Sequence, residues 1–178
     1  MLIVKYLDQA YPDTPRLIAP GKEMLLATLH ALVLANMSAP LYAPIASRIV
    51  SAMDEDSATV YLGRVERVIG TSIEEFLSTS GEEDKYWEKA KNGFGVVDSC
   101  IRKAALAQWG GRVNEHQPYL AGEELSYADL IVVAPLRWAQ KALGENHERW
   151  KQIAAWNGGR WGRMCDGMKQ YLETHSQQ

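Results

Sequence analysis

The stretch Tyr119-Leu-Ala-Gly-Glu-Glu-Leu-Ser-Tyr-Ala-Asp-Leu-Ile-Val-Val-Ala-Pro-Leu-Arg-Trp138 decides the fold. The Ser126 side chain can accept the backbone N–H three residues on, and the Asp129 carboxylate can reach back to the N–H of Ser126. This capping box predicts a helix that begins at Tyr127. Because the residues that follow Asp129 are apolar, we expect this helix to be buried nearly all round, with a kink at Pro135.

The rest of the chain is predicted to form further helices. Apolar residues recur at helical spacing in the ranges 2–10, 21–53, 57–69, 73–77, 82–109, 146–156 and 160–173. Pro40 and Pro44 predict a kink or break near residues 38–44. Gly93 and Gly95 weaken the longest helix by about 1 kcal/mol each relative to Ala, but they also permit a close helix crossing. Since no segment has a convincing strand pattern, the predicted fold class is all-α.

Glycines, prolines and capping residues mark the breaks between these helices. Gly110-Gly111 follows the longest helix, and Asn157-Gly-Gly159 separates the last two. Ser72 with Glu75 forms a second capping box. Three prolines in the stretch 11–21 predict a linker rather than a regular element.

Composition limits the classes of function. The chain has 178 residues, 47% of them hydrophobic and 23% charged, which is enough to bury a core without disulfides or metal. The net charge of −3, without clusters of basic and aromatic residues, argues against nucleic acid or an anionic membrane as a partner. The longest uncharged run, Met24 to Ser47, is a poor membrane span because His30, Asn36 and two prolines interrupt it. We therefore expect a soluble, cytoplasmic protein.

Motifs for metal binding, phosphate binding and an esterase nucleophile do not occur in the sequence, so no metal site is predicted. The two cysteines, Cys100 and Cys165, lie on apolar faces of predicted helices and lack metal-ligand spacing. A reactive thiolate needs an electropositive, accessible setting. Packed, reduced thiols are therefore favoured over a disulfide or a nucleophile.

Several motifs resemble the glutathione transferase family. The segment Leu-x-Gly-x-x-Leu-Ser-x-Ala-Asp that ends at Asp129 is similar to the start of the buried helix in the helical C-terminal domain of that family. The family's Ser and Asp shape the fold and do no chemistry, which implies a structural role for Ser126 and Asp129. The segment Tyr6 to Leu17 resembles the last helix of the family's thioredoxin-like domain and the linker that follows it.

Two further segments are most like fungal transferases of the etherase type. They are Val60 to Glu75 and the run Trp156-Asn-Gly-Gly-Arg-Trp161. The resemblance implies a glutathione-transferase C-terminal-like helical bundle over residues 21–178. Residues 1–20 would be a residual helix and linker of a truncated thioredoxin-like domain.

The resemblance also implies what this chain cannot do alone. In the family, the thioredoxin-like domain supplies the catalytic Ser, Cys or Tyr, the cis-proline and the Glu-Ser pair that holds glutathione. We expect most of that domain to be missing here. The chain alone should therefore bind glutathione poorly and fail to activate it, so no cofactor is predicted.

What remains is the hydrophobic-substrate half of the family's site. By position, the resemblance implies these residues: His30, Leu34, Met37, Tyr42, Arg137, Trp138 and Trp161. For each of them an ordinary place in the core is the competing and favoured interpretation. His30 is the best candidate for an acid or base, although a satisfied core histidine is commoner. Arg137 could hold an anionic ligand, but a structural ion pair is favoured.

Three functions stay open at this point. The chain could bind small hydrophobic or aromatic molecules and catalyse a glutathione-independent isomerisation or cyclisation. It could be a fragment whose catalysis needs the missing domain. It could also be a helical protein-interaction module. Because truncation should expose an apolar face, we expect either a homodimer or a partner that covers this face.

Overall fold

The computed structural model describes residues 2–50, 53–109, 119–120, 124–169 and 171. The regular elements of this part of the chain are helices, and no strand occurs within it. The elements are α1 (Leu2–Ala10), α2 (Glu23–Val33), the π-helical turn η1 (Leu34–Ser38), α3 (Ala39–Val50), α4 (Glu55–Ile69), α5 (Ile73–Ser78), α6 (Glu82–Trp109), α7 (Tyr127–Leu143) and α8 (Glu148–Gly167). The all-α prediction is confirmed. Gly110-Gly111, which we expected to end α6, lies outside the described residues.

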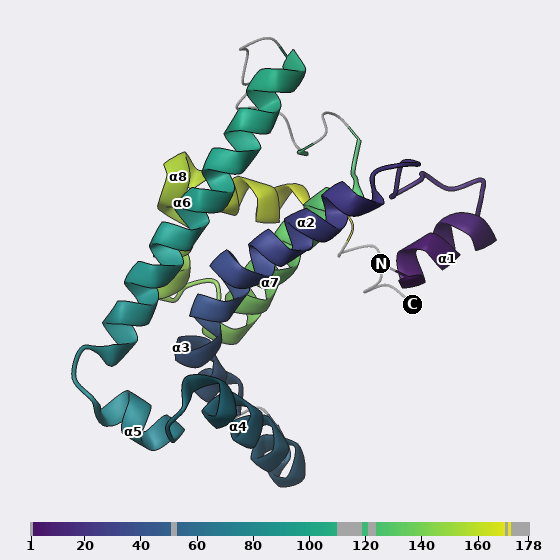
Figure 1. Ribbon diagram of the computed structural model, residues 1–178. Coiled ribbons are helices and arrows are strands. Elements are labelled where there is room, and N and C mark those ends of the chain that lie inside the picture. Colours follow the sequence, from purple (N-terminus) through teal and green to yellow (C-terminus); the bar gives the residue numbers. More distant parts are fainter. Residues whose placement is uncertain (1, 51–52, 110–118, 121–123, 170, 172–178) are drawn as a thin grey trace.

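Helix α7 occupies the middle of the bundle. It contacts α2, α3 and α8, while the long helix α6 crosses η1 and α3 and also contacts α8. Figure 1 shows α2 and α7 side by side, with α6 running along one side of the molecule. Helices α4 and α5 lie beyond the end of α3, and α1 lies beside the start of α2.

The start of α7 is fixed by a buried carboxylate. Asp129 accepts hydrogen bonds from the backbone N–H of Ser126 (2.9 Å), from the Ser126 hydroxyl (2.6 Å) and from the backbone N–H of Leu120 (2.6 Å). The N–H of Tyr127, the first residue of the helix, donates to the carbonyl oxygen of Leu17 at 3.1 Å. These bonds hold the linker, the segment before the helix and the helix itself in one place.

The second capping box forms only in part. The Ser72 hydroxyl accepts the N–H of Glu75 at 3.1 Å, as predicted. The Glu75 carboxylate, however, accepts from the hydroxyl of Thr71 instead of the Ser72 N–H. The backbone N–H of Ile73, the first residue of α5, donates to the carboxylate of Glu66 at 3.1 Å. This hydrogen bond joins α4 to α5.

The irregularity that Pro40 causes lies one turn ahead of the predicted kink at residues 38–44. Proline has no N–H, so Pro40 cannot donate to the carbonyl oxygen of Asn36 in the usual helical pattern. The chain widens into the π-helical turn η1, in which the N–H of Ala39 donates to the oxygen of Leu34. Pro44 lies inside α3 without ending it.

Gly93 permits the close crossing of α6 over η1. A β-carbon at this position would overlap the carbonyl oxygen of Asn36 and lie 2.9 Å from its carbonyl carbon. Gly95, two residues along the same helix, has no atom nearer to its β-carbon position than the Asn157 side-chain nitrogen, at 4.0 Å. Of the two glycines, only Gly93 is therefore required by packing.

The predicted break in the last helical region is confirmed. Backbone angles leave the helical region from Trp156 to Gly159, and Asn157 has a φ of 53°. The Asn157 side chain accepts the indole N–H of Trp161 at 2.8 Å. The rings of Trp156 and Trp161 stand edge-on to Phe94 of α6, at centroid distances of 5.2 and 5.3 Å. Two tryptophans at this turn thus pack against one core phenylalanine.

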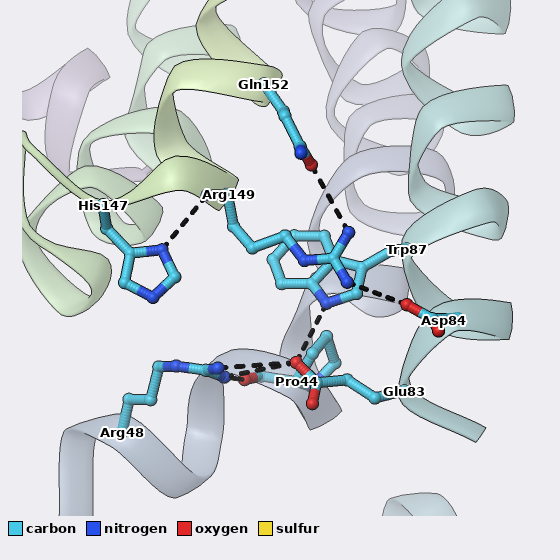
Figure 2. Close-up of polar contacts among 8 residues, drawn as sticks. All are labelled: Pro44, Arg48, Glu83, Asp84, Trp87, His147, Arg149 and Gln152. Carbon is cyan, nitrogen blue, oxygen red and sulfur yellow. Dashed lines mark hydrogen bonds and ion pairs between the residues drawn. The ribbon is translucent and has the colours of Figure 1, made fainter. Parts of the chain in front are cut away.

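Figure 2 shows a polar cluster that joins α3, α6 and α8 around the buried Trp87. The Glu83 carboxylate accepts the Trp87 indole N–H at 3.0 Å and pairs with Arg48 at 3.5 Å. The Arg149 guanidinium lies 5.0 Å from the centre of the Trp87 ring and pairs with Asp84 at 2.8 Å. Since these charges pair with one another around a core residue, the cluster has a structural role.

The apolar face of α1 is exposed. Its large apolar side chains in contact with solvent are Leu2, Ile3, Tyr6 and Leu7. The helix is attached through its other side, where Val4 packs against the core and the Asp8 carboxylate accepts the N–H groups of Leu17 and Ile18 at 3.0 and 2.9 Å. A surface of this kind is where a partner could bind.

One stretch among the described residues, Glu23–Ala46, is long and apolar enough to cross a membrane by length and composition. It includes the π-helical turn, and its helices pack against α6 and α7. The core helix of a soluble protein passes the same test, so this stretch alone does not indicate a membrane protein.

Substituting the two glycines of α6 separately tests the helix crossing. Gly93→Ala should lower the free energy of unfolding by about 2 kcal/mol, because the backbones must move apart. Gly95→Ala should raise it by up to about 1 kcal/mol, because alanine favours the helix and meets open space. Urea denaturation followed by circular dichroism measures both. Equal effects of the two substitutions would contradict the assigned crossing point.

Candidate functional site

A cavity of about 630 Å³ opens among α2, η1, α3, α4 and α7. Along the path from α2 to α3 its lining residues recur every four positions: His30, Leu34, Ser38 and Tyr42. In a regular α-helix each step of four residues rotates by about 40°, so the last of them would be turned about 120° away from the first. The wider π-helical turn takes up part of this rotation. It therefore keeps the row of side chains along one cavity.

The opposite wall is formed by α7. Its lining residues include Tyr127, Leu130, Ala134 and Trp138. Ala134 is exposed, although its neighbours Val133 and Pro135 are buried. The expectation that α7 is buried nearly all round is corrected at this residue, because the small side chain of Ala134 leaves the cavity open beside the helix.

Aromatic rings from three helices form a continuous wall. Tyr42 of α3 lies nearly parallel to Trp138 of α7, with ring centres 6.3 Å apart and an angle of 24° between the planes. Tyr61 of α4 stands edge-on to Tyr42, with ring centres 6.1 Å apart. Aromatic walls of this kind suit flat, apolar ligands.

The hydroxyl of Tyr61 is buried and lacks a hydrogen-bond partner among the described residues. Leaving a buried hydroxyl unpaired costs about 1–3 kcal/mol. Burial, reinforced by the nearby Tyr42, raises the pKa of Tyr61 above its usual value. The hydroxyl therefore keeps its proton at neutral pH.

The cavity is lined without formal charge. Among the described residues, Lys, Arg, Asp and Glu are absent from its lining, and the polar groups there are the hydroxyls of Ser38 and three tyrosines, together with His30. A carboxylate buried without a cation is costly. The arrangement therefore favours uncharged ligands, with His30 as the acid–base side chain of the described lining.

The structure brings together only part of the set of residues that the sequence suggested. His30, Leu34, Tyr42 and Trp138 line the cavity. Met37 and Trp161 are fully buried in the core and are left out of the site. His30 is exposed at the cavity, although a satisfied core histidine was favoured. Ser38, Tyr61 and Tyr127 were missed, because their sequence context indicates only ordinary helix faces.

Arg137 is not one of the cavity's described lining residues. Its guanidinium donates to the side-chain oxygen of Gln140, and not to a carboxylate as the favoured ion pair required. Burial raises the pKa of Cys165 to about 12, although the charge of Arg137 acts in the opposite direction. Cys165 is therefore a protonated, buried thiol at neutral pH, whereas Cys100 is exposed. Groups of His, Cys, Asp and Glu that could hold a metal ion do not occur among the described residues.

Residues 25–171 match a family described as "Glutathione S-transferase, C-terminal domain". No curated protein matches the sequence. The fold is similar to solved transferase structures from two fungi. One is the transferase CsGST63524 of Ceriporiopsis subvermispora in complex with glutathione, with 26% identity, a TM-score of 0.80, and coverage of 95% of this chain and 64% of that one.

Two further structures are similar over the same region. The transferase GSTFuA2 from Phanerochaete chrysosporium is 25% identical, with a TM-score of 0.79 and coverage of 96% of this chain and 64% of that one. CsGST83044 of Ceriporiopsis subvermispora, also in complex with glutathione, is 27% identical, with a TM-score of 0.77 and coverage of 97% and 64%. This chain thus spans 64% of the length of these solved proteins.

The two thiols should differ sharply toward a thiol reagent. In the folded protein at neutral pH, Cys100 should react quickly with Ellman's reagent, while Cys165 should react only after unfolding, because it is buried and its pKa is raised to about 12. Cys100→Ser should leave the folded protein almost unreactive, and Cys165→Ser should leave the fast reaction unchanged. Simultaneous reaction of both thiols in the folded protein would contradict this assignment.

Proposed function

Because the chain belongs to the glutathione S-transferase family by its C-terminal domain, we propose that it binds small hydrophobic or aromatic molecules in the cavity between α2, α3, α4 and α7. The observation that carries this proposal is the aromatic wall of Tyr61, Tyr42 and Trp138 in a cavity of about 630 Å³ that is lined without formal charge. This volume lies within the range of cavities that bury a small organic ligand.

Glutathione is not the ligand that this cavity favours. The tripeptide carries two carboxylates, and the part of the lining that the structure describes offers neither Lys nor Arg to pair with them. The chain covers 64% of the transferases that were solved with glutathione. We infer that this chain alone binds glutathione weakly and does not activate it.

A glutathione-independent reaction on the bound molecule belongs to the same proposal. His30 lies at the cavity with an exposed imidazole, so a ligand and a proton donor or acceptor would meet there. The reactions that such a group supports without a thiol are proton transfers, as in an isomerisation or a cyclisation. The alternative is a transferase of the etherase type whose catalysis needs a thioredoxin-like domain outside this chain.

A second role, binding of another protein, is favoured by the exposed apolar face of α1. We propose that residues 1–20 act as an attachment to the helical domain of residues 21–178, and that a second copy of the chain or another protein covers α1. Nucleic acid and membranes are not proposed as partners, and we expect the protein to be soluble and cytoplasmic.

Ligand titration tests the cavity. Quenching of tryptophan fluorescence by 2-acetonaphthone, a flat uncharged ketone, should saturate because Trp138 lines the cavity, whereas glutathione should give no saturable change. Ala134→Phe should weaken ketone binding at least about tenfold by filling the space. Ala104→Phe, at an exposed position of α6, is the matched control and should bind as the wild type does. Tight, saturable binding of glutathione, or no binding of the ketone, would overturn the proposal.

The α1 face is tested by measuring the molar mass in solution with size-exclusion chromatography and light scattering. The wild type should form a dimer, and the double variant Ile3→Lys, Tyr6→Lys should be monomeric, because charge on the shared apolar face opposes its burial. Val68→Lys, at an exposed valine of α4, should remain dimeric. A monomeric wild type would exclude the homodimer and leave a different protein as the partner.

A further inference from the structure

We propose that the cavity selects extended, uncharged phenols, which place an aromatic ring against Tyr42 and Trp138 and a hydroxyl between His30 and Tyr127 at the opposite end. This inference rests on the proposed ligand-binding function and names the class of ligand. It follows from the different chemistry of the two ends of the cavity and from the distance between them.

The two walls of the cavity run in the same direction. Tyr127, the first residue of α7, donates its backbone N–H to the carbonyl oxygen of Leu17, in the linker before α2, at 3.1 Å. Eleven residues later, Trp138 stacks on Tyr42 of α3, with ring centres 6.3 Å apart. Helix α7 therefore begins beside the linker and reaches α3 at Trp138, and Figure 1 shows α2 and α7 side by side.

This shared direction places His30 opposite Tyr127. His30 lies twelve residues before Tyr42 on one wall, and Tyr127 lies eleven residues before Trp138 on the other. At a helical rise of 1.5 Å per residue, both positions are about 16–18 Å from the stacked rings. The cavity thus has a polar end, formed by His30 and Tyr127, and an aromatic end, formed by Tyr42 and Trp138.

The polar end can be reached by a ligand and offers it two hydrogen-bonding groups. His30 is exposed, Tyr127 is half-buried, and both line the cavity. Among the described residues, neither the imidazole nor the Tyr127 hydroxyl has a hydrogen-bond or ion-pair partner. A neutral imidazole and a tyrosine hydroxyl can each donate or accept. A ligand hydroxyl can donate one bond and accept another, so it can satisfy both groups at once, whereas a carbonyl oxygen can only accept.

The middle of the cavity sets the shape of the ligand. Between the two ends the lining is mostly apolar and includes Leu34, Leu130 and Ala134. A volume of about 630 Å³ spread over this length leaves room for one ring across and not for two side by side. A phenol with a single ring would reach one end only. Two rings joined end to end by a stiff link reach both ends and lose little freedom on binding.

The charge of the ligand follows from the same lining. A phenol is uncharged at neutral pH, because its hydroxyl titrates near pH 10 as that of tyrosine does. It therefore enters a cavity whose described lining has no formal charge without the cost of burying an unpaired ion. Its hydroxyl would lie beside the His30 imidazole, which the proposed proton transfer uses, so the same molecules are the candidate substrates.

The test compares trans-4-hydroxystilbene with trans-stilbene, which has nearly the same shape but lacks the hydroxyl. Quenching of tryptophan fluorescence gives the dissociation constants. The wild type should bind the phenol about tenfold more tightly, because two hydrogen bonds form at the polar end. His30→Leu and Tyr127→Phe should each reduce this ratio to about threefold, and the double variant should reduce it to about one. Tyr11→Phe, at an exposed tyrosine, is the matched control and should keep the wild-type ratio.

A change at the aromatic end should act differently. Tyr42→Leu should weaken both stilbenes by a similar factor and leave their ratio unchanged, since it removes stacking and not the hydrogen bonds to the hydroxyl. Because the ratio compares two ligands on one protein, a general effect of a variant on packing cancels.

The outcomes separate this inference from the proposal on which it rests. If stilbene binds but the wild-type ratio is near one, or if His30→Leu and Tyr127→Phe leave the ratio unchanged, the inference is wrong and the cavity proposal stands. A ratio that falls only in Tyr42→Leu would place the hydroxyl at the aromatic end and would also overturn it. If 2-acetonaphthone binds and neither stilbene does, the inference fails alone. If none of the three binds, the cavity proposal fails as well.

Discussion

The contact between the Gly93 position and the Asn36 carbonyl is the constraint on which the arrangement of the helices depends. It brings the backbone of α6 against the π-helical turn η1 with no side chain between them. Once α6 is held there, Phe94 on the next position meets Trp156 and Trp161 of α8, and the buried Ala90 and Val97 join the same core. The crossing requires Gly93 on α6, because the carbonyl oxygen of Asn36 in η1 occupies the space that a β-carbon would need.

The same local feature shapes the cavity on the other side of the chain path. Pro40 cannot donate the bond that would keep the preceding turn α-helical, and the π-helical turn results. On one face this turn presents the Asn36 carbonyl to α6. On another it keeps His30, Leu34, Ser38 and Tyr42 along a single cavity instead of letting them spiral away from it. One missing N–H therefore affects both the packing of the longest helix and the lining of the proposed site, which is consistent with the frequent occurrence of π-helical turns at functional sites.

Local sequence signals predicted the helices well and the site only in part. The beginning of α7 and the break at Asn157 could be predicted because capping residues and glycines act on their own backbone. Two other interactions could not be predicted in this way. The hydrogen bond from the Leu120 N–H to Asp129 depends on the geometry of the loop before α7. The ion pair between the buried Asp98 and Arg160 of α8, at 2.5 Å, joins segments that are far apart in the sequence. For the same reason apolar periodicity could not separate Met37, in the core, from Leu34, at the cavity. Both fit a helical repeat, and only the neighbouring helices decide which one meets solvent. Tyr61 shows the limit most clearly, since an unpaired hydroxyl is a property of its surroundings and not of its sequence.

The position of the cavity decides which part of the family's chemistry this chain can carry alone. Its described lining residues come from α2, η1, α3, α4 and α7, and none of them belongs to α1 or to the linker that follows it. A partner that covers the exposed face of α1 therefore need not supply a wall of the cavity. Ligand binding and partner binding can be separated by mutation: changes at Ile3 and Tyr6 act on one surface, and changes at Ala134 and Tyr61 act on the other. If transferase chemistry needs a second domain, that domain must bring the groups for a charged thiol tripeptide, because the described lining of this cavity carries no formal charge.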